Sequence, residues 1–216
     1  MKKISILLSL VAVLIVLGWF AFDLTRKDGA SDSEFIEFAK SKTDDSVLTF
    51  RNFVPMPPAL EIVSGSDGEM GYAVFHSDTQ WQRYLGYPWV QEHNITTLPQ
   101  LQAYVEKHHP QAKATGKAYA DNLALYGAKN WYDWSIGNWG TKWDACSATL
   151  THVESGHASY SFETAWSPAM PVFLAMSERF PDLKICATFD EEADFYKFEA
   201  AWFGGNQVSE RNLMHE

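Results

Sequence analysis

The stretch that decides the fold is residues 145–188, which read ACSATLTHVESGHASYSFETAWSPAMPVFLAMSERFPDLKICAT. Two runs in it, 145–151 and 158–164, are rich in strand-forming residues, and the second alternates between polar and apolar side chains. The residues between the runs include Glu-Ser-Gly at 154–156, which is typical of a turn. This pattern predicts a β-hairpin.

A helix and another strand follow the hairpin in the same stretch. Pro168 after Ser167 is typical of a helix start. Apolar side chains then recur at helical spacing, at Val172, Phe173, Met176 and Phe180. Pro181 ends the helical pattern. Residues 183–188 then alternate between apolar and polar side chains, as expected for a strand. The order of hairpin, helix and strand predicts an α+β fold, in which helices cover one face of an antiparallel sheet.

Upstream of the hairpin, the sequence predicts two further elements and a helical insertion. Ser31 and Glu34 form a capping-box signature before a helix that we expect to end near Lys42. Residues 47–53 are rich in strand formers and precede several prolines, so they predict a strand. Residues 72–130 predict a helical insertion, because their apolar side chains recur at helical spacing. Downstream, an aromatic strand is expected at 195–203.

Tryptophan is concentrated just before the hairpin, at Trp131, Trp134, Trp139 and Trp143. An indole buries on the order of 200 Å² and dominates the core or interface that it joins. In one interpretation, an aromatic platform with polar handles binds a peptide, a sugar or a base edge. The residues of this candidate binding site are Trp139, Lys142, Trp143, Asp144 and Trp166. In the other interpretation the same indoles are core and turn packing, which is the commoner use of buried indoles.

Catalytic and metal-binding patterns are weak in this sequence. It contains no GxSxG, P-loop or dinucleotide-binding glycine pattern, so we predict no catalytic residues and no cofactor. His152 and His157, with Glu154 and Glu163, are residue types that bind metals. The two histidines are five residues apart across the predicted turn, and they lack HExxH spacing and a third fixed ligand, which predicts a solvated hairpin tip and no metal site. The alternative of another class is a hydrolytic enzyme that uses Asp144, Glu163 and His152, and it requires these side chains to converge.

Charge and cysteine content exclude some classes of protein. The formal net charge is −10, and proteins that bind phosphate backbones need clustered Lys and Arg, so nucleic acid is not an expected partner. The alternative is that residues 107–117, which include three lysines and two histidines, form a local basic groove that binds nucleic acid despite the acidic net charge. Cys146 and Cys186 are too few for a four-thiolate metal site. They either pair or remain free thiols.

The amino terminus carries an uncharged, apolar run at residues 4–22, preceded by Lys2 and Lys3. As a helix this run would be about 28 Å long, close to the thickness of a bilayer core. It predicts an uncleaved single-pass transmembrane anchor in the lipid bilayer, with a linker to residue 30 and the domain at 31–216. The flanking charges favour a domain outside the cytoplasm. Alternatively, residues 19–25 form the first strand of the domain. The apolar run is then only about fifteen residues long, which is too short to span a bilayer comfortably.

Three motifs, taken in order, resemble the YubB-type ferredoxin-like domain family of phage and plasmid proteins. They are NWGTKWD at 138–144, FETAWSP at 162–168 and FPDL at 180–183, and FVPMP at 53–57 is similar to the family's proline elbow. The resemblance spans roughly residues 32–205. It implies a ferredoxin-like split β-α-β sandwich without iron–sulfur chemistry, interrupted here by the helical insertion at 72–130.

Together these observations predict a membrane-anchored ferredoxin-like protein of phage or plasmid origin. We expect it to be a binding or accessory module rather than an enzyme, because no catalytic motif accompanies the aromatic residues. The expected partner is a protein or another macromolecule, recognised through an aromatic surface or an exposed sheet edge.

Overall fold

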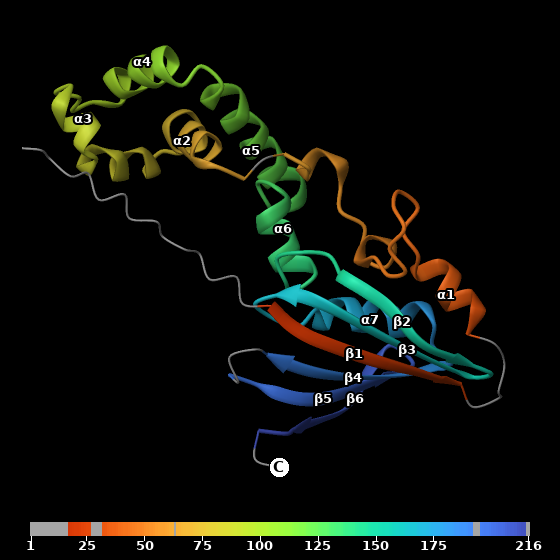
Figure 1. Ribbon diagram of the computed structural model, residues 1–216. Helices are drawn as coiled ribbons and strands as arrows, with labels where there is room; N and C mark the ends of the chain where they lie inside the picture. Colours follow the sequence, from red (N-terminus) through yellow and green to blue (C-terminus); the bar gives the residue numbers. More distant parts are fainter. Residues whose placement is uncertain (1–16, 27–31, 63, 192–194, 215–216) are drawn as a thin grey trace, which may run out of the picture.

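The computed structural model describes residues 17–26, 32–62, 64–191 and 195–214 (Figure 1). Its described part contains a six-stranded antiparallel sheet in the order β2-β3-β1-β4-β5-β6. The strands are β1 (Leu17–Arg26), β2 (Cys146–Glu154), β3 (His157–Ala165), β4 (Leu183–Glu191), β5 (Lys197–Phe203) and β6 (Asn206–Asn212). The predicted hairpin is confirmed as β2 and β3, and the predicted strand after the helix is confirmed as β4.

Helices connect and cover these strands. The α-helices are α1 (Ser33–Ala39), α2 (Ser66–Phe75), α3 (Pro88–Glu92), α4 (Leu98–His108), α5 (Ala112–Tyr126), α6 (Trp131–Asn138) and α7 (Met170–Arg179). Short 3₁₀ turns are η1 (Phe50–Asn52), η2 (Pro58–Leu60) and η3 (Gln80–Gly86). The helix predicted after Ser167 is confirmed as α7, whose buried face carries Val172, Phe173 and Met176.

Strand β1 corrects the predicted membrane anchor. It lies in the middle of the sheet, between β3 and β4. Phe20, Phe22 and Leu24 are buried against the core, whereas Asp23 and Thr25 between and after them are exposed, which is the two-residue period of a strand. Part of the apolar run at 4–22 therefore supplies the core of the sheet.

The predicted single-pass transmembrane helix, and with it the predicted membrane localisation, are wrong; the bilayer as a partner remains a prediction. None of the helices in the described ranges combines the length and the apolar character needed to cross a bilayer. Residues 4–16 lie outside the described residues. Without the residues that enter β1, the apolar run is shorter than the roughly 20 residues that a spanning helix needs.

The fold class is α+β, but the sheet differs from the predicted sandwich. Residues 47–53 form no strand; they contain the 3₁₀ turn η1, in which Phe50 is buried. Strands β5 and β6 extend the sheet beyond β4, so the described sheet is larger than a four-stranded split β-α-β sandwich.

Two separate groups of buried side chains form the interior. The sheet core lies between the strands, α7, α1 and the loop around η1, and it contains Phe22, Phe162 and Phe173. The second group lies within residues 66–126, which we name the helical lobe; it includes Val74, Leu101 and Val105. Figure 1 shows the helical lobe beyond α6, away from the sheet. It begins at Ser66, slightly before the insertion predicted at 72–130.

The two cysteines are both free thiols. Cys146 begins β2, and Cys186 lies on β4. Burial raises the pKa of the Cys146 thiol, and the neighbouring carboxylates of Asp144 and Glu163 raise it further. This environment favours the protonated, unreactive form of that thiol.

Candidate functional site

Trp139, the first residue of the predicted site, belongs to the sheet core. It is 2% exposed, and its indole Nε1–H donates a hydrogen bond to the Val54 carbonyl oxygen at 2.9 Å. The ring packs edge-on against Trp134, with 5.5 Å between the ring centroids. Because its face is covered and its donor is used, Trp139 offers nothing to a ligand.

Asp144 also serves the fold. Its Oδ1 accepts hydrogen bonds from the backbone N–H of Phe50 at 2.6 Å and of Ala145 at 2.8 Å. Its Oδ2 accepts a hydrogen bond from the Thr49 hydroxyl at 2.6 Å. Burial raises the pKa of Asp144, although these hydrogen bonds oppose the change. The carboxylate therefore ties the η1 loop to the start of β2.

Lys142, Trp143 and Trp166 do come together at the surface, joined by Tyr132. The Lys142 Nζ lies 4.7 Å from the ring centroid of Trp166, 5.0 Å from that of Trp143 and 5.9 Å from that of Tyr132. Trp166 has a φ of 72°, an unusual conformation for a large side chain, and is one-third exposed. The aromatic surface of this cluster is already occupied by the chain's own lysine, so the rings stabilise Lys142 through cation–π contacts.

The three residues of the hydrolase hypothesis are dispersed. Asp144 lies in the loop before β2, where its oxygens are used by the η1 loop. His152 lies opposite Ser159 on β3, whereas Glu163 lies four residues further along the same strand. At the usual rise of a strand that separation is about 13 Å. A general acid and base need to lie within hydrogen-bond reach of one reacting group, so this geometry gives the hypothesis no support.

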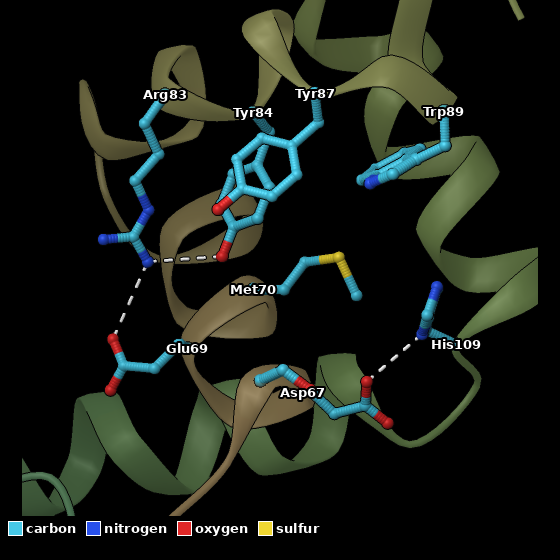
Figure 2. Close-up of a pocket in the computed structure, with 9 residues that line it drawn as sticks. Asp67, Glu69, Met70, Arg83, Tyr84, Tyr87, Trp89 and His109 are labelled. Atoms are coloured by element: carbon cyan, nitrogen blue, oxygen red, sulfur yellow. Dashed lines mark hydrogen bonds and ion pairs between the residues drawn. The ribbon is translucent and has the colours of Figure 1, made fainter. Parts of the chain in front are cut away.

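A pocket in the helical lobe was not anticipated from the sequence. It is a cavity of about 400 Å³, within the size range of small-ligand sites. Figure 2 shows its side chains, with aromatic rings on one side of Met70 and the acidic residues on the other. The lining residues are Ser66, Asp67, Glu69, Met70, Arg83, Tyr84, Tyr87, Trp89 and His109.

The aromatic side of the pocket is a row of contacting rings. Tyr84 and Tyr87 are stacked, with 5.3 Å between their centroids, and Tyr87 lies 6.4 Å from Trp89. Trp89 in turn stacks on Tyr104 of α4 at 4.9 Å. Tyr84 is buried, whereas Tyr87 is 48% exposed. The row therefore begins inside the helical lobe and reaches solvent, where a ligand can contact ring faces.

Two acidic residues from the first turns of α2 form the opposite side. Glu69 is charge-compensated: its Oε1 lies 2.5 Å from the Lys129 Nζ and its Oε2 lies 3.7 Å from the Arg83 Nη2. Arg83 also donates a hydrogen bond to the Tyr84 hydroxyl at 3.2 Å, which is the main reason that the pKa of Arg83 is raised. Asp67 has a different environment, because His109 Nδ1, at 3.1 Å, is charged only when the ring is protonated.

The pocket was missed because its residues are spread over 44 positions, from Ser66 to His109, and form no recognised motif. The helices that carry them are short, and a 3₁₀ segment, η3, supplies two of them. One signal was available: Trp81, Tyr84, Tyr87 and Trp89 fall within nine residues, a density comparable with that of the later tryptophans. Of the later tryptophans, Trp134 and Trp139 belong to the sheet core.

Comparison with known proteins adds one distant similarity. No protein-family model and no curated protein matches the chain. Among solved structures, it is similar to the crystal structure of a protein api92 from Yersinia pseudotuberculosis, of family-model DUF1281. The two share 11% sequence identity over 92% of this chain and 98% of that chain, with a TM-score of 0.48.

Proposed function

We propose that this chain is a binding protein whose helical lobe receives a cationic side chain, lysine or arginine, of a polypeptide partner. The observation that carries this proposal is the pocket itself, in which the rings of Tyr87 and Trp89 line the same cavity as the carboxylate of Asp67. The Tyr84 ring beside them is buried and already carries Arg83, 5.1 Å from the ring centroid. Membership in the YubB-type family and an origin in mobile elements remain predictions.

A cation fits this pocket for two physical reasons. Aromatic faces attract ammonium and guanidinium groups, by about 0.5–2 kcal/mol depending on desolvation. Asp67 supplies a negative charge that no lysine or arginine of the described residues pairs with at ion-pair distance. Arg83 lines the pocket too, but its charge is already engaged by Glu69 and by the Tyr84 hydroxyl. The net charge of −10 adds a long-range attraction for a basic partner.

The exposure of the pocket favours a side chain presented by a larger partner. Asp67 and Tyr87 are each about half exposed, so a ligand that contacts both remains partly in water. A lysine or arginine side chain can enter with its charged end while the partner's main chain stays outside. Small-molecule sites, in contrast, usually bury most of the ligand surface.

The test measures binding of an acetylated, amidated trilysine peptide to the full chain by isothermal titration calorimetry. We expect Asp67→Asn and Tyr87→Leu each to weaken binding about tenfold, which corresponds to about 1.4 kcal/mol, because one removes the charge and the other a ring face. The matched control is Glu106→Gln, which removes the same charge from an exposed site of α4 outside the pocket. Circular dichroism verifies that each variant is folded.

Three results would count against the proposal. If a triglutamate peptide binds as well as trilysine, the site does not select a cation. If Glu106→Gln weakens binding as much as Asp67→Asn, the attraction comes from the overall charge and not from the pocket. If free lysine binds as tightly as the peptide, the site serves a small molecule and the polypeptide partner is wrong.

A further inference from the structure

The end of the β2–β3 hairpin places two histidines and two carboxylates on one face of the sheet. In one row across the strands, His152 lies opposite Ser159, which lies opposite Asp23 of β1. In the next row, Glu154 lies opposite His157. Residues two apart on a strand share a face, so these side chains project together. Ala158, on the other face, is buried in the sheet core.

The three residues His152, Glu154 and His157, which we name the hairpin cluster, have the spacing of metal ligands. One nitrogen or oxygen of each lies within 4.8 Å of the other two. The Glu154 carboxylate is central: Oε2 lies 3.5 Å from His152 Nε2, and Oε1 lies 3.6 Å from His157 Nδ1. Ligand atoms at 2.0–2.2 Å from a tetrahedral zinc ion are roughly 3.3–3.6 Å apart. With either carboxylate oxygen as the ligand atom, its separation from one of the two histidine nitrogens therefore already matches.

Asp23 supports the orientation that His157 would need as a ligand. Its Oδ1 lies 3.5 Å from His157 Nε2, the ring nitrogen that does not face Glu154. Asp23 is itself held by the Ser159 hydroxyl, which donates a hydrogen bond to the same oxygen at 2.5 Å. Histidines that bind metals usually donate their second ring N–H to a carboxylate, which fixes the tautomer and the ring.

We propose that the hairpin cluster is a binding site for a divalent first-row transition ion, with zinc as the expected ion. Imidazole nitrogens and a carboxylate are ligands that zinc prefers, whereas calcium and magnesium prefer oxygen ligands alone. His152, Glu154 and His157 are the ligands, water completes the coordination, and Asp23 is a positioning residue. From the sequence alone the two histidines predicted a solvated hairpin tip, because their spacing matches no helical metal-binding motif; it is the pairing of β2 with β3 that brings them together with Glu154.

The test titrates metal-stripped full-length protein with Zn²⁺ in competition with a chromophoric chelator. We expect one ion per chain, with binding more than about 100-fold weaker in His157→Ala and in Glu154→Gln and about tenfold weaker in Asp23→Asn. Loss of a carboxylate behind a ligating histidine typically costs 10–100-fold in affinity. Visible absorption of bound Co²⁺ gives a second readout of nitrogen and oxygen coordination.

A matched control separates this site from other histidines. His93 and His108 are neighbours in the helical lobe, with 6.4 Å between ring centroids, so the double variant His93→Ala, His108→Ala also removes two imidazoles. It should leave zinc binding unchanged. The proposal is overturned if the wild-type chain binds no zinc, or if the control variant loses binding while Glu154→Gln retains it. Because no peptide is present, these results are independent of the proposed cation pocket.

Discussion

Asp144 shows how a residue that suggests chemistry can be fully used by the fold. Its two oxygens accept three hydrogen bonds, two from backbone N–H groups and one from Thr49. A buried amide that loses such an acceptor costs about 1–3 kcal/mol. The sequence indicates Asp144 as a candidate site residue. Its hydrogen-bond partners Thr49 and Phe50 lie about 95 positions away in the chain, so no local sequence pattern predicts these contacts.

We expect Asp144→Ala to lower the free energy of unfolding by about 2–3 kcal/mol, because it leaves the Phe50 amide and the Thr49 hydroxyl without their acceptor. Asp144→Asn should cost less than about 1 kcal/mol, since its oxygen can accept from both amides while its NH₂ donates to Thr49. Urea unfolding at neutral pH measures both. Equal losses in the two variants would show that these hydrogen bonds contribute little.

The pH dependence of the same residue has a definite sign. Burial raises the pKa of Asp144, so the folded chain binds this proton more tightly than the unfolded chain. Its contribution to stability is therefore greatest at low pH and is lost as the pH rises through the raised pKa. We expect wild type to gain stability relative to Asp144→Asn as the pH falls from neutrality, measured by urea unfolding of both. A difference that stays constant with pH would contradict this.

At the scale of elements, helices α2 and α5 meet with almost no space between their backbones. A Cβ atom at Gly71 would lie 1.7 Å from the Ala112 carbonyl oxygen, and one at Gly116 would lie 2.2 Å from the Gly71 carbonyl carbon. Two glycines thus face each other across the helix pair. The sequence predicts the helices, but it does not indicate which glycines form the contact, because that depends on how the pair crosses.

We expect Gly71→Ala to separate α2 from α5 and to lower the free energy of unfolding of the helical lobe by about 3 kcal/mol or more, since backbone atoms cannot yield as a side chain does. Gly137→Ala, in α6, is the control. A Cβ there meets nothing within 4 Å, so the better helix propensity of alanine should stabilise the chain by about 0.5–1 kcal/mol. Thermal unfolding, monitored by circular dichroism, compares the stability of the Gly71→Ala and Gly137→Ala variants with that of the wild type. A neutral Gly71→Ala would refute the close packing.

For the whole molecule, the two groups of buried side chains have different consequences. Those of the helical lobe contact one another, and those of the sheet core lie between the sheet and α7. Cooperative unfolding units usually follow such groups. The proposed cation pocket belongs to the helical lobe and the hairpin cluster to the sheet, so damage to one unit should spare the site in the other.

We expect Leu101→Ala to destabilise the helical lobe by about 2–4 kcal/mol through the cavity that it leaves. Hydrogen–deuterium exchange should then become faster in α4 and α5 and stay unchanged in β1 and β3. Val172 is equally buried but lies in the sheet core. Val172→Ala should therefore make exchange faster in β1 and β3 and leave it unchanged in α4 and α5. If both variants accelerate exchange throughout the described chain, the molecule unfolds as a single unit.

The sequence by itself determined the β2–β3 hairpin, α7 and β4, because each of these elements carries its own periodicity and its own turn residues. Tertiary structure decided the role of the apolar run, the cation pocket and the hairpin cluster. An uncharged run is compatible with a helix in lipid or with a buried strand, and the choice was made by pairing with β3 and β4. The proposed cation pocket joins residues spread from Ser66 to His109, whose proximity depends on helix packing. The hairpin cluster depends on the register of β2 with β3, and its positioning residue Asp23 comes from β1.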